Sequence, residues 1–187
     1  MSFLAPIPFY FLRHGHTDWN VQHRCMGQIN VVLNQLGIKQ AYQSAAYLKK
    51  LGIKTICYSP LLRAIRTANI INESLNVKMI EVSGLKEANL GTLQGNQDED
   101  LLKGWKQGIC PKRAEPYDDF VSRVKKALDV CLSHAGPVLV VSHGGVYSAI
   151  QSLLQLDMVY GLENCEPISY TPPASIDGLW SQSSVGM

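Results

Sequence analysis

Long hydrophobic runs, a strong net charge and paired cysteines are all missing from this sequence. No run reaches the ~18 apolar residues of a membrane-spanning helix, and the apolar stretch 1–12 has two prolines and no basic leader, which makes it a poor signal peptide. The net charge of +2 argues against a general attraction to nucleic acid or to an anionic membrane. We therefore expect a cytoplasmic protein whose anion binding, if any, is local.

The five cysteines are odd in number, widely spaced and free of any CxxC pair, which disfavours a disulfide framework or a thiolate metal site. Only 17% of residues are charged and 46% are hydrophobic, the composition of a globular protein rather than a disordered one. A chain of 187 residues is long enough to bury a core without metal or disulfides. We expect one domain over residues 1–187, loosely ordered after about residue 171, where Pro, Ser and Gly are frequent.

Short apolar runs alternate along the chain with segments of helical periodicity. The predicted strands are 9–12, 55–58, 78–82 and 138–141, and the predicted helices are 34–51, 60–75, 117–134 and one that begins near 144. Continuously apolar strands that alternate with helices form parallel sheets with both faces covered. The pattern therefore predicts an α/β three-layer sandwich with a mostly parallel central sheet flanked by helices.

Cationic side chains follow three of the predicted strands. The first strand runs into Arg13-His14-Gly15, the second leads to Arg63, and the last ends in Ser142-His143-Gly144-Gly145. Ligands of such sheets bind at the carboxyl ends of the strands. A helix that begins near Gly144 points its backbone N–H groups at the same place. The sequence therefore predicts a phosphate-binding pocket, although either histidine taken alone would fit a purely structural role equally well.

The same residues resemble the histidine phosphatase (phosphoglycerate mutase-like) superfamily. The resemblance is spread over most of the chain, in five motifs that occur in order. They are Arg13-His14-Gly15 with Thr17, Trp19, Asn20, Arg24, Gly27 and Leu33; Gly37, Gln40 and Ala41; Ser59-Pro60-Leu61 with Arg63-Ala64 and Thr67-Ala68; Leu85, Glu87, Gly91 and Gly95; and Ser142-His143-Gly144-Gly145. The resemblance implies a phosphoglycerate mutase-like fold.

It also implies a phosphoryl-transfer site with His14 as the nucleophile. A histidine attacks only when neutral, and the nearby Arg13, Arg63 and His143 should lower its pKa by like-charge repulsion. Those three residues, together with the Asn20 amide, would bind the phosphoryl oxygens and stabilise the charge of the transition state. The resemblance thus implies that these residues and the backbone of Gly144 bind a small phosphorylated substrate.

Glu87 is the implied general acid, and it would later deprotonate the attacking water. The implied mechanism requires neither cofactor nor metal. A mutase must protect its phosphohistidine from water, and mutases that this chain resembles carry a long insertion between the acid and the last histidine, whereas 88–142 is short here. We therefore expect phosphomonoester hydrolysis, with phosphoglycerate mutase activity as the alternative, while the sequence carries no signal for oligomeric state.

Several positions depart from the family pattern, and we expect most of them to border the substrate. They are His16, Met26, Asn30, Arg66 and Leu93-Gln94. Arg66 lies three residues from Arg63 on a predicted helix, so it either adds a second anion contact or is simply exposed.

Three other readings of the sequence remain. Cys57 and Arg63 match the C-x5-R pattern of cysteine-dependent phosphatases, but Pro60 has no N–H for a phosphate and no glycine relieves the loop. The second reading is a metal site formed by His14, His16, Asp18 and His143, but no carboxylate-rich motif completes the set of ligands. A non-catalytic phosphate-binding protein is the third reading, although both histidines, both arginines and the acid are present.

Overall fold

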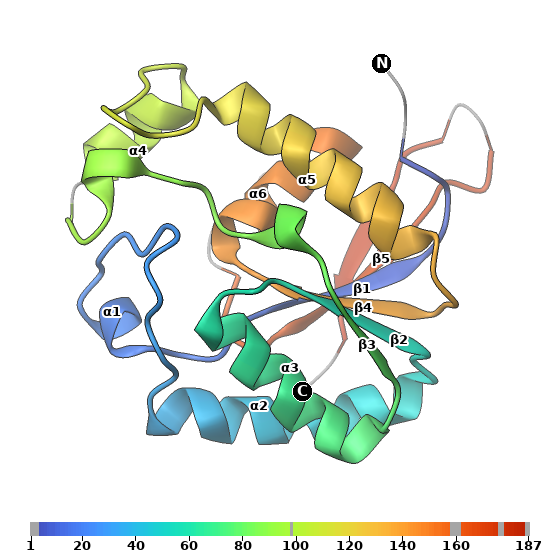
Figure 1. Cartoon of the computed structure of the whole chain (residues 1–187). Helices are drawn as coiled ribbons and strands as arrows, with labels where there is room; N and C mark the ends of the chain where they lie inside the picture. The colour runs from blue at the N-terminus through green and yellow to red at the C-terminus, as the bar shows by residue number, and fades with distance from the viewer. Residues whose placement is uncertain (1–3, 98, 158–161, 176–177, 186–187) are drawn as a thin grey trace.

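A computed structural model describes residues 4–97, 99–157, 162–175 and 178–185. Its centre is a six-stranded sheet in the order β3-β2-β4-β1-β5-β6 (Figure 1). The strands are β1 (Phe9–Arg13), β2 (Thr55–Tyr58), β3 (Lys78–Glu81), β4 (Val138–Ser142), β5 (Pro167–Thr171) and β6 (Ser181–Ser184). The first four run parallel, and β5 pairs antiparallel with both β1 and β6. The predicted mostly parallel sheet is confirmed.

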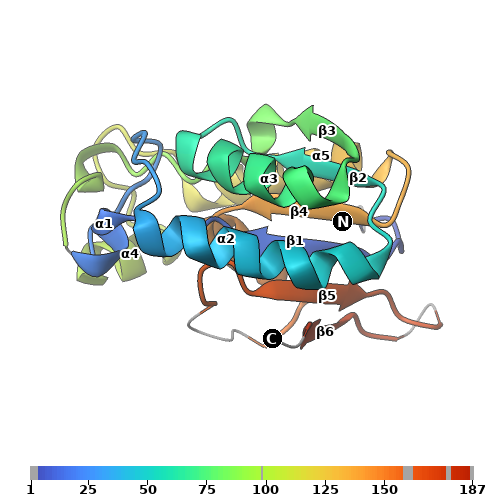
Figure 2. The same ribbon diagram turned by 90° about the horizontal axis from the view of Figure 1, so that it is seen from below.

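Helices cover both faces of this sheet. Figure 2 looks onto the face that is lower in Figure 1, and helices lie in front of the strands there. The helices are α1 (Asp18–Val21), α2 (Gln35–Leu48), α3 (Leu62–Leu75), α4 (Glu99–Lys106), α5 (Tyr117–Leu132) and α6 (Gly144–Leu154). Short 3-10 turns occur at Lys49–Leu51, Ser83–Leu85 and Gly91–Leu93. No helix within the described residues combines the length and apolar character needed to cross a bilayer.

Alternate strand residues feed two separate cores. Phe9 and Phe11 of β1 pack with the helices α5 and α6, whereas Leu12 packs with α2 and α3. β4 divides in the same way, with Val140 in the first core and Val141 in the second. Because side chains alternate across a strand, fully apolar strands are what a sheet buried on both faces requires.

Local sequence explains where the second helix begins and ends. The Asn34 side chain accepts a hydrogen bond from the Gly37 N–H (2.9 Å) and caps α2. The 3-10 turn after α2 ends at Gly52, whose φ of 67° favours glycine. Both positions lie where the sequence pattern predicted the ends of a helix.

Four elements were not predicted, namely α1, α4, β5 and β6. The four residues of α1 are too few to show a hydrophobic period, but Thr17 and Asn20 cap the helix reciprocally. Within the tail after about residue 171, which was expected to be loosely ordered, Ser181–Ser184 pair with β5 as the edge strand β6, and 176–177 and 186–187 lie outside the described residues. Ser and Gln make that strand polar, so hydropathy gave no signal for it.

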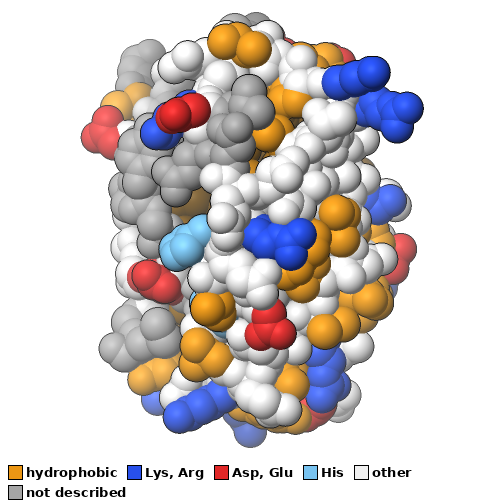
Figure 3. Space-filling model, turned by 90° about the vertical axis from the view of Figure 1, so that its left-hand side faces the viewer, with side chains coloured by type: hydrophobic (Ala, Val, Ile, Leu, Met, Phe, Trp, Pro, Cys, Tyr) orange, Lys and Arg blue, Asp and Glu red, His pale blue; other side chains and the backbone are white. Residues whose placement is uncertain are grey.

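The parallel strands direct their carboxyl ends toward one end of the molecule, where α1 and α4 also lie (Figures 1 and 2). Figure 3 looks onto this end, and a histidine and a basic side chain are exposed near its centre. The predicted site residues are therefore brought to the end of the sheet where ligands of this architecture bind.

Candidate active site

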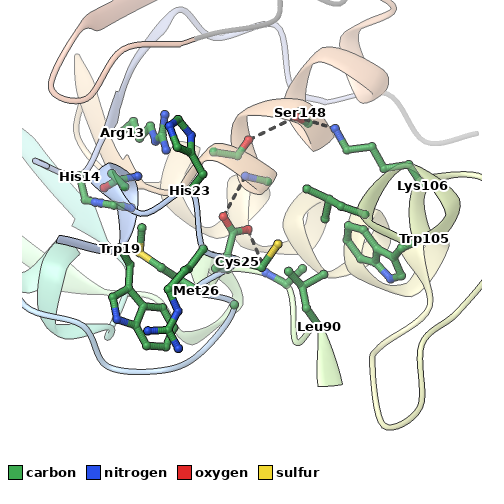
Figure 4. Close-up of a pocket in the computed structure, with 18 of the residues that line it drawn as sticks. Arg13, His14, Trp19, His23, Cys25, Met26, Leu90, Trp105, Lys106 and Ser148 are labelled. Carbon is green, nitrogen blue, oxygen red and sulfur yellow. Dashed lines mark hydrogen bonds between the residues drawn. The ribbon is translucent and has the colours of Figure 1, made fainter. Parts of the chain in front are cut away.

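A cavity of about 940 Å³ opens at the carboxyl ends of the parallel strands (Figure 4). Arg13 and His14 reach it from the end of β1, Arg63 from the first turn of α3, and Gly144 from the start of α6. Glu87 lies in the loop between two 3-10 turns. Residues far apart in the sequence thus form one site.

His14 is held in a single tautomer from both sides of its ring. Its side chain is buried, and its Nδ1–H donates to the Gly15 carbonyl oxygen (2.8 Å). Arg63 Nε donates to His14 Nε2 (3.2 Å), and an arginine can only donate. Nε2 therefore carries a lone pair and no proton. Burial lowers the pKa of His14 well below its usual value, and the charges of Arg63 and Arg13 lower it further.

Arg63 is itself fixed by backbone carbonyl groups. Its guanidinium is buried and donates from Nη1 to the Ile29 oxygen (2.9 Å) and from Nη2 to the Gly27 oxygen (2.8 Å). Burial lowers the pKa of Arg63 to about 10, so the group stays cationic at neutral pH. A fully charged donor is thereby placed against His14.

Two buried nitrogen atoms beside His14 find no hydrogen-bond partner among the residues that the structure describes. They are His143 Nδ1 and Arg13 Nε, although His143 Nε2 bonds Ser59 Oγ (2.7 Å) and Arg13 Nη1 donates to the Leu162 oxygen (2.8 Å). The rings of His14 and His143 lie 5.3 Å apart, centre to centre. Burial lowers the pKa of His143, and Arg63 lowers it further. An unpartnered buried polar atom is costly, so this pair fits a site that an anion completes.

The Glu87 carboxylate is held at the start of α6. Its Oε2 accepts from the Gly145 N–H and its Oε1 from the Ala88 N–H, both at 2.9 Å. A Cβ atom on residue 145 would overlap Glu87 Oε1, so only glycine permits this approach. The glycine at position 145 therefore makes room for the Glu87 carboxylate.

Arg123 on α5 holds the backbone of the segment that carries Glu87. Its Nη1 donates to the carbonyl oxygens of Gly84 (2.8 Å) and Lys86 (3.0 Å). Its Nη2 forms an ion pair with Glu115 (2.6 Å), which neutralises the arginine. The acid is thus positioned from both α5 and α6.

The sequence of this chain matches a model of the histidine phosphatase superfamily (branch 1) over residues 9–171. The chain belongs to this superfamily. One relative is the uncharacterised phosphatase PhoE of Bacillus subtilis, which is 36% identical over 142 residues. These residues cover 74% of the chain and 72% of the relative. A probable phosphoglycerate mutase, GpmB of Erwinia tasmaniensis, is 32% identical over 159 residues, 78% of the chain and 73% of the relative.

Solved structures of phosphatases share the fold of this superfamily member. A mycobacterial glucosyl-3-phosphoglycerate phosphatase complexed with VO3 aligns with a TM-score of 0.81 and 26% identity, covering 94% of this chain and 97% of that one. A phosphoserine phosphatase from Entamoeba histolytica, in complex with 3-phosphoglyceric acid, aligns with a TM-score of 0.77 and 25% identity, covering 96% and 97%. The expected phosphoglycerate mutase-like α/β fold is confirmed.

Most residues predicted for the site of this superfamily member line the cavity. These are Arg13, His14, Asn20, Arg63, Glu87 and Gly144, while His143 is fully buried with its ring centre 5.3 Å from that of His14. The Asn20 side-chain oxygen accepts from the Thr17 N–H (3.0 Å) and so belongs to the cap of α1.

Two of the six positions that depart from the family pattern line the cavity, and the other four, which include Leu93 and Gln94, do not. His16 and Met26 line the cavity, as expected for residues on the substrate side. Arg66 is exposed outside the cavity, so the structure does not place it as a second anion contact. Asn30 also lies outside the lining, and its side-chain oxygen accepts from the Leu62 N–H (3.1 Å) at the start of α3.

Sequence reasoning missed three residues around this cavity. Asn164 donates to the His14 carbonyl oxygen (2.7 Å), Lys106 projects from α4, and Arg123 supports the Glu87 segment. Lys106 is the last residue of α4 and Asn164 lies just before β5, and neither element was predicted. Arg123 was one polar residue among several on a predicted helix. A polar residue just before an unrecognised strand carries no signal of its own.

Two of the rival motifs can be compared with the structure. Cys57 is buried in the core outside the cavity lining, far from the exposed position that a nucleophilic thiol needs. Across the part of the chain that the structure describes, no three His, Cys, Asp or Glu side chains group as metal ligands, so His14, His16, Asp18 and His143 do not form a ligand set.

Proposed function

We propose that this protein is a phosphomonoester hydrolase that acts through a phosphohistidine on His14, with Glu87 as general acid and base. The observation that carries the proposal is the neutral His14 ring, whose Nε2 lone pair lies beside a buried arginine in the same cavity as a carboxylate. A nucleophile and a proton donor in one cavity are the two groups that phosphoryl transfer through histidine requires.

The first step transfers the phosphoryl group to His14. The Nε2 lone pair attacks phosphorus, the bond from phosphorus to the leaving oxygen breaks, and protonated Glu87 gives its proton to the departing alkoxide. Water then attacks the phosphohistidine and Glu87 takes a proton from it. The products are the alcohol and inorganic phosphate, and both residues return to their starting states.

Four side chains and one backbone group would hold the phosphoryl oxygens. Arg63 is already beside His14 Nε2, and Arg13 Nε and His143 Nδ1 are the two unpartnered nitrogens. His143 donates from Nδ1 when the Ser59 hydroxyl donates to its Nε2, which the 2.7 Å contact permits. The Asn20 amide and the Gly144 N–H at the start of α6 complete the set.

Hydrolysis is favoured over phosphoglycerate mutase activity by the short segment between Glu87 and His143. In the structure this segment consists of a 3-10 turn, the eight-residue α4, α5, β4 and their connections. It forms one wall of a cavity that opens to solvent, which lets water reach the phosphohistidine. A mutase remains the second candidate because a relative is named as a probable phosphoglycerate mutase.

The test is phosphate release from 4-nitrophenyl phosphate by the wild type and by His14→Ala. We expect turnover by the wild type, its loss in the variant, and unchanged turnover in His134→Ala, which removes a histidine outside the cavity. Phosphate binding without turnover by the wild type would instead indicate a non-catalytic binding protein. Conversion of 3-phosphoglycerate to 2-phosphoglycerate faster than phosphate appears would indicate a mutase.

A further inference from the structure

Gln28 lies between the two residues whose carbonyl groups hold Arg63. Gly27 precedes it and Ile29 follows it, and their oxygens accept from Arg63 Nη2 and Nη1. Arg63 in turn places its Nε against His14 Nε2. Gln28 itself does not line the cavity, so any effect of its side chain on the reaction must pass through other groups.

The Gln28 side chain extends from this loop to the residue that carries the acid. Its Nε2 donates to the Glu87 carbonyl oxygen (3.0 Å), and because a carbonyl oxygen can only accept, the orientation of the amide is fixed. Arg123 Nη2 approaches the same oxygen from α5, at 3.4 Å. One side chain therefore joins the loop that holds Arg63 to the backbone of Glu87.

A second glutamine, Gln94, holds the peptide unit that precedes Gln28. Gln94 Oε1 accepts from the Gln28 N–H (2.8 Å). That N–H belongs to the same planar peptide unit as the Gly27 carbonyl, so a bond at the N–H fixes the direction in which the carbonyl meets Arg63. The two hydrogen bonds also polarise each other through the peptide unit.

Gly27 makes this approach possible. Its φ of 51° lies in the left-handed region that favours glycine. A Cβ atom on residue 27 would overlap the Gln94 side chain, so the contact between Gln94 and this peptide unit requires the glycine. Gln94, like Gln28, lies outside the cavity lining.

We propose that Gln28 and Gln94 are positioning residues that connect the two halves of the site. Gln94 orients the Gly27 carbonyl that holds Arg63, and Gln28 holds the backbone of Glu87. This inference rests on the proposed phosphatase function and adds to it two residues that act from outside the cavity.

The two glutamines should affect different parts of the reaction. Arg63 stabilises the phosphoryl group, which every substrate shares, whereas Glu87 as an acid matters only for a leaving group that needs a proton. Their hydrogen-bond roles are also opposite, because the Gln28 side chain donates and the Gln94 side chain accepts. An ionised glutamate can accept but cannot donate, so it should replace Gln94 and not Gln28.

The experiment for Gln28 compares phosphate release from glycerol 3-phosphate and from 4-nitrophenyl phosphate. Nitrophenolate departs without a proton, so kcat/KM for the aryl ester depends little on Glu87. We expect Gln28→Met to lower kcat/KM for glycerol 3-phosphate by about 5- to 50-fold, mainly through kcat, the range for a polar group that loses its hydrogen-bond partner. The value for 4-nitrophenyl phosphate should fall by less than about threefold, and Gln28→Glu should behave like Gln28→Met.

The experiment for Gln94 predicts the other pattern. Gln94→Met should lower kcat/KM for both esters by a similar factor, about 5- to 50-fold. Gln94→Glu keeps the acceptor and should recover most of the activity that Gln94→Met loses. The matched control is Gln43→Met, which removes an exposed glutamine of α2 outside the cavity and should leave both esters unaffected.

Three results would overturn the inference. They are equal losses for the two esters in Gln28→Met, a Gln94→Glu variant as impaired as Gln94→Met, and wild-type kcat/KM in both methionine variants. In each case turnover of 4-nitrophenyl phosphate by the wild type leaves the phosphatase function standing. If the wild type hydrolyses neither ester, the phosphatase function is wrong and the inference falls with it.

Discussion

Gly145→Ala should displace the carboxyl group of the general acid, Glu87, without replacing that residue. The added Cβ would overlap Glu87 Oε1 and displace the hydrogen bond from the Gly145 N–H to Oε2, so the carboxylate must move away from α6. A misplaced general acid costs about 10²- to 10⁴-fold in rate. We expect kcat/KM for an alkyl phosphate such as glycerol 3-phosphate to fall within that range.

An aryl phosphate separates this effect from general damage to the site. Nitrophenolate departs without protonation, so kcat/KM for 4-nitrophenyl phosphate should fall less than about tenfold. The second step still needs Glu87 as a base, and the variant should therefore release a rapid burst of nitrophenol followed by slow turnover. Stopped-flow absorbance measures the burst, and Glu87→Gln should reproduce the same pattern.

The matched control is Gly104→Ala in α4, where the added Cβ would meet Ile109 at 3.5 Å, an ordinary contact. It should leave both substrates unchanged. Equal losses for alkyl and aryl phosphates in Gly145→Ala, with no burst, would refute the assignment of Glu87 as the acid.

Four further predictions concern two arginines of the site, the pH dependence of stability and the need for a metal. Arg63→Lys keeps a cation but loses the forked contacts to Gly27, Ile29 and His14, and we expect at least a 100-fold fall in kcat; a loss below tenfold would contradict this. Arg123→Met should lower kcat for alkyl phosphates more than for aryl phosphates, since Arg123 positions the Glu87 segment, whereas uniform losses would indicate a structural role. His14 and His143 both have lowered pKa values, so below about pH 6.5 the unfolded state binds more protons than the folded state. The free energy of unfolding should therefore fall below that pH by up to about 1.4 kcal/mol per pH unit for each histidine. Urea unfolding at pH 7.5 and 5.5 measures this change, and equal free energies at the two pH values would contradict it. Treatment with a chelator should leave activity intact, and its loss would support the metal-site reading.

The parallel part of the sheet was predictable because burial on both faces makes most residues of a strand such as Val138–Ser142 apolar. The antiparallel strands β5 and β6 were not predictable in this way. Ser181–Ser184 is a polar edge strand, and its place in the sheet comes from backbone pairing with β5 rather than from hydrophobic side chains.

The phosphate side of the candidate site was predictable for a related reason. His14 and His143 stand directly after strands, and strand order brings β1 and β4 together. The side of the cavity that Lys106 lines depends on α4. This helix has only eight residues, too few for a clear hydrophobic period, so the sequence did not indicate that Lys106 lines the site. The Arg63 contact that leaves His14 Nε2 without a proton also had no signal, because it depends on the relative placement of β1 and α3.

The central claim is that His14 carries the phosphoryl group during turnover. Rapid-quench experiments with a ³²P-labelled phosphomonoester, followed by peptide mapping, test it most directly. We predict a label on His14 that is labile in acid and stable in base, that appears within the first turnover and that is absent in His14→Ala. Turnover without any labelled enzyme, or an acid-stable label on another residue, would contradict the account.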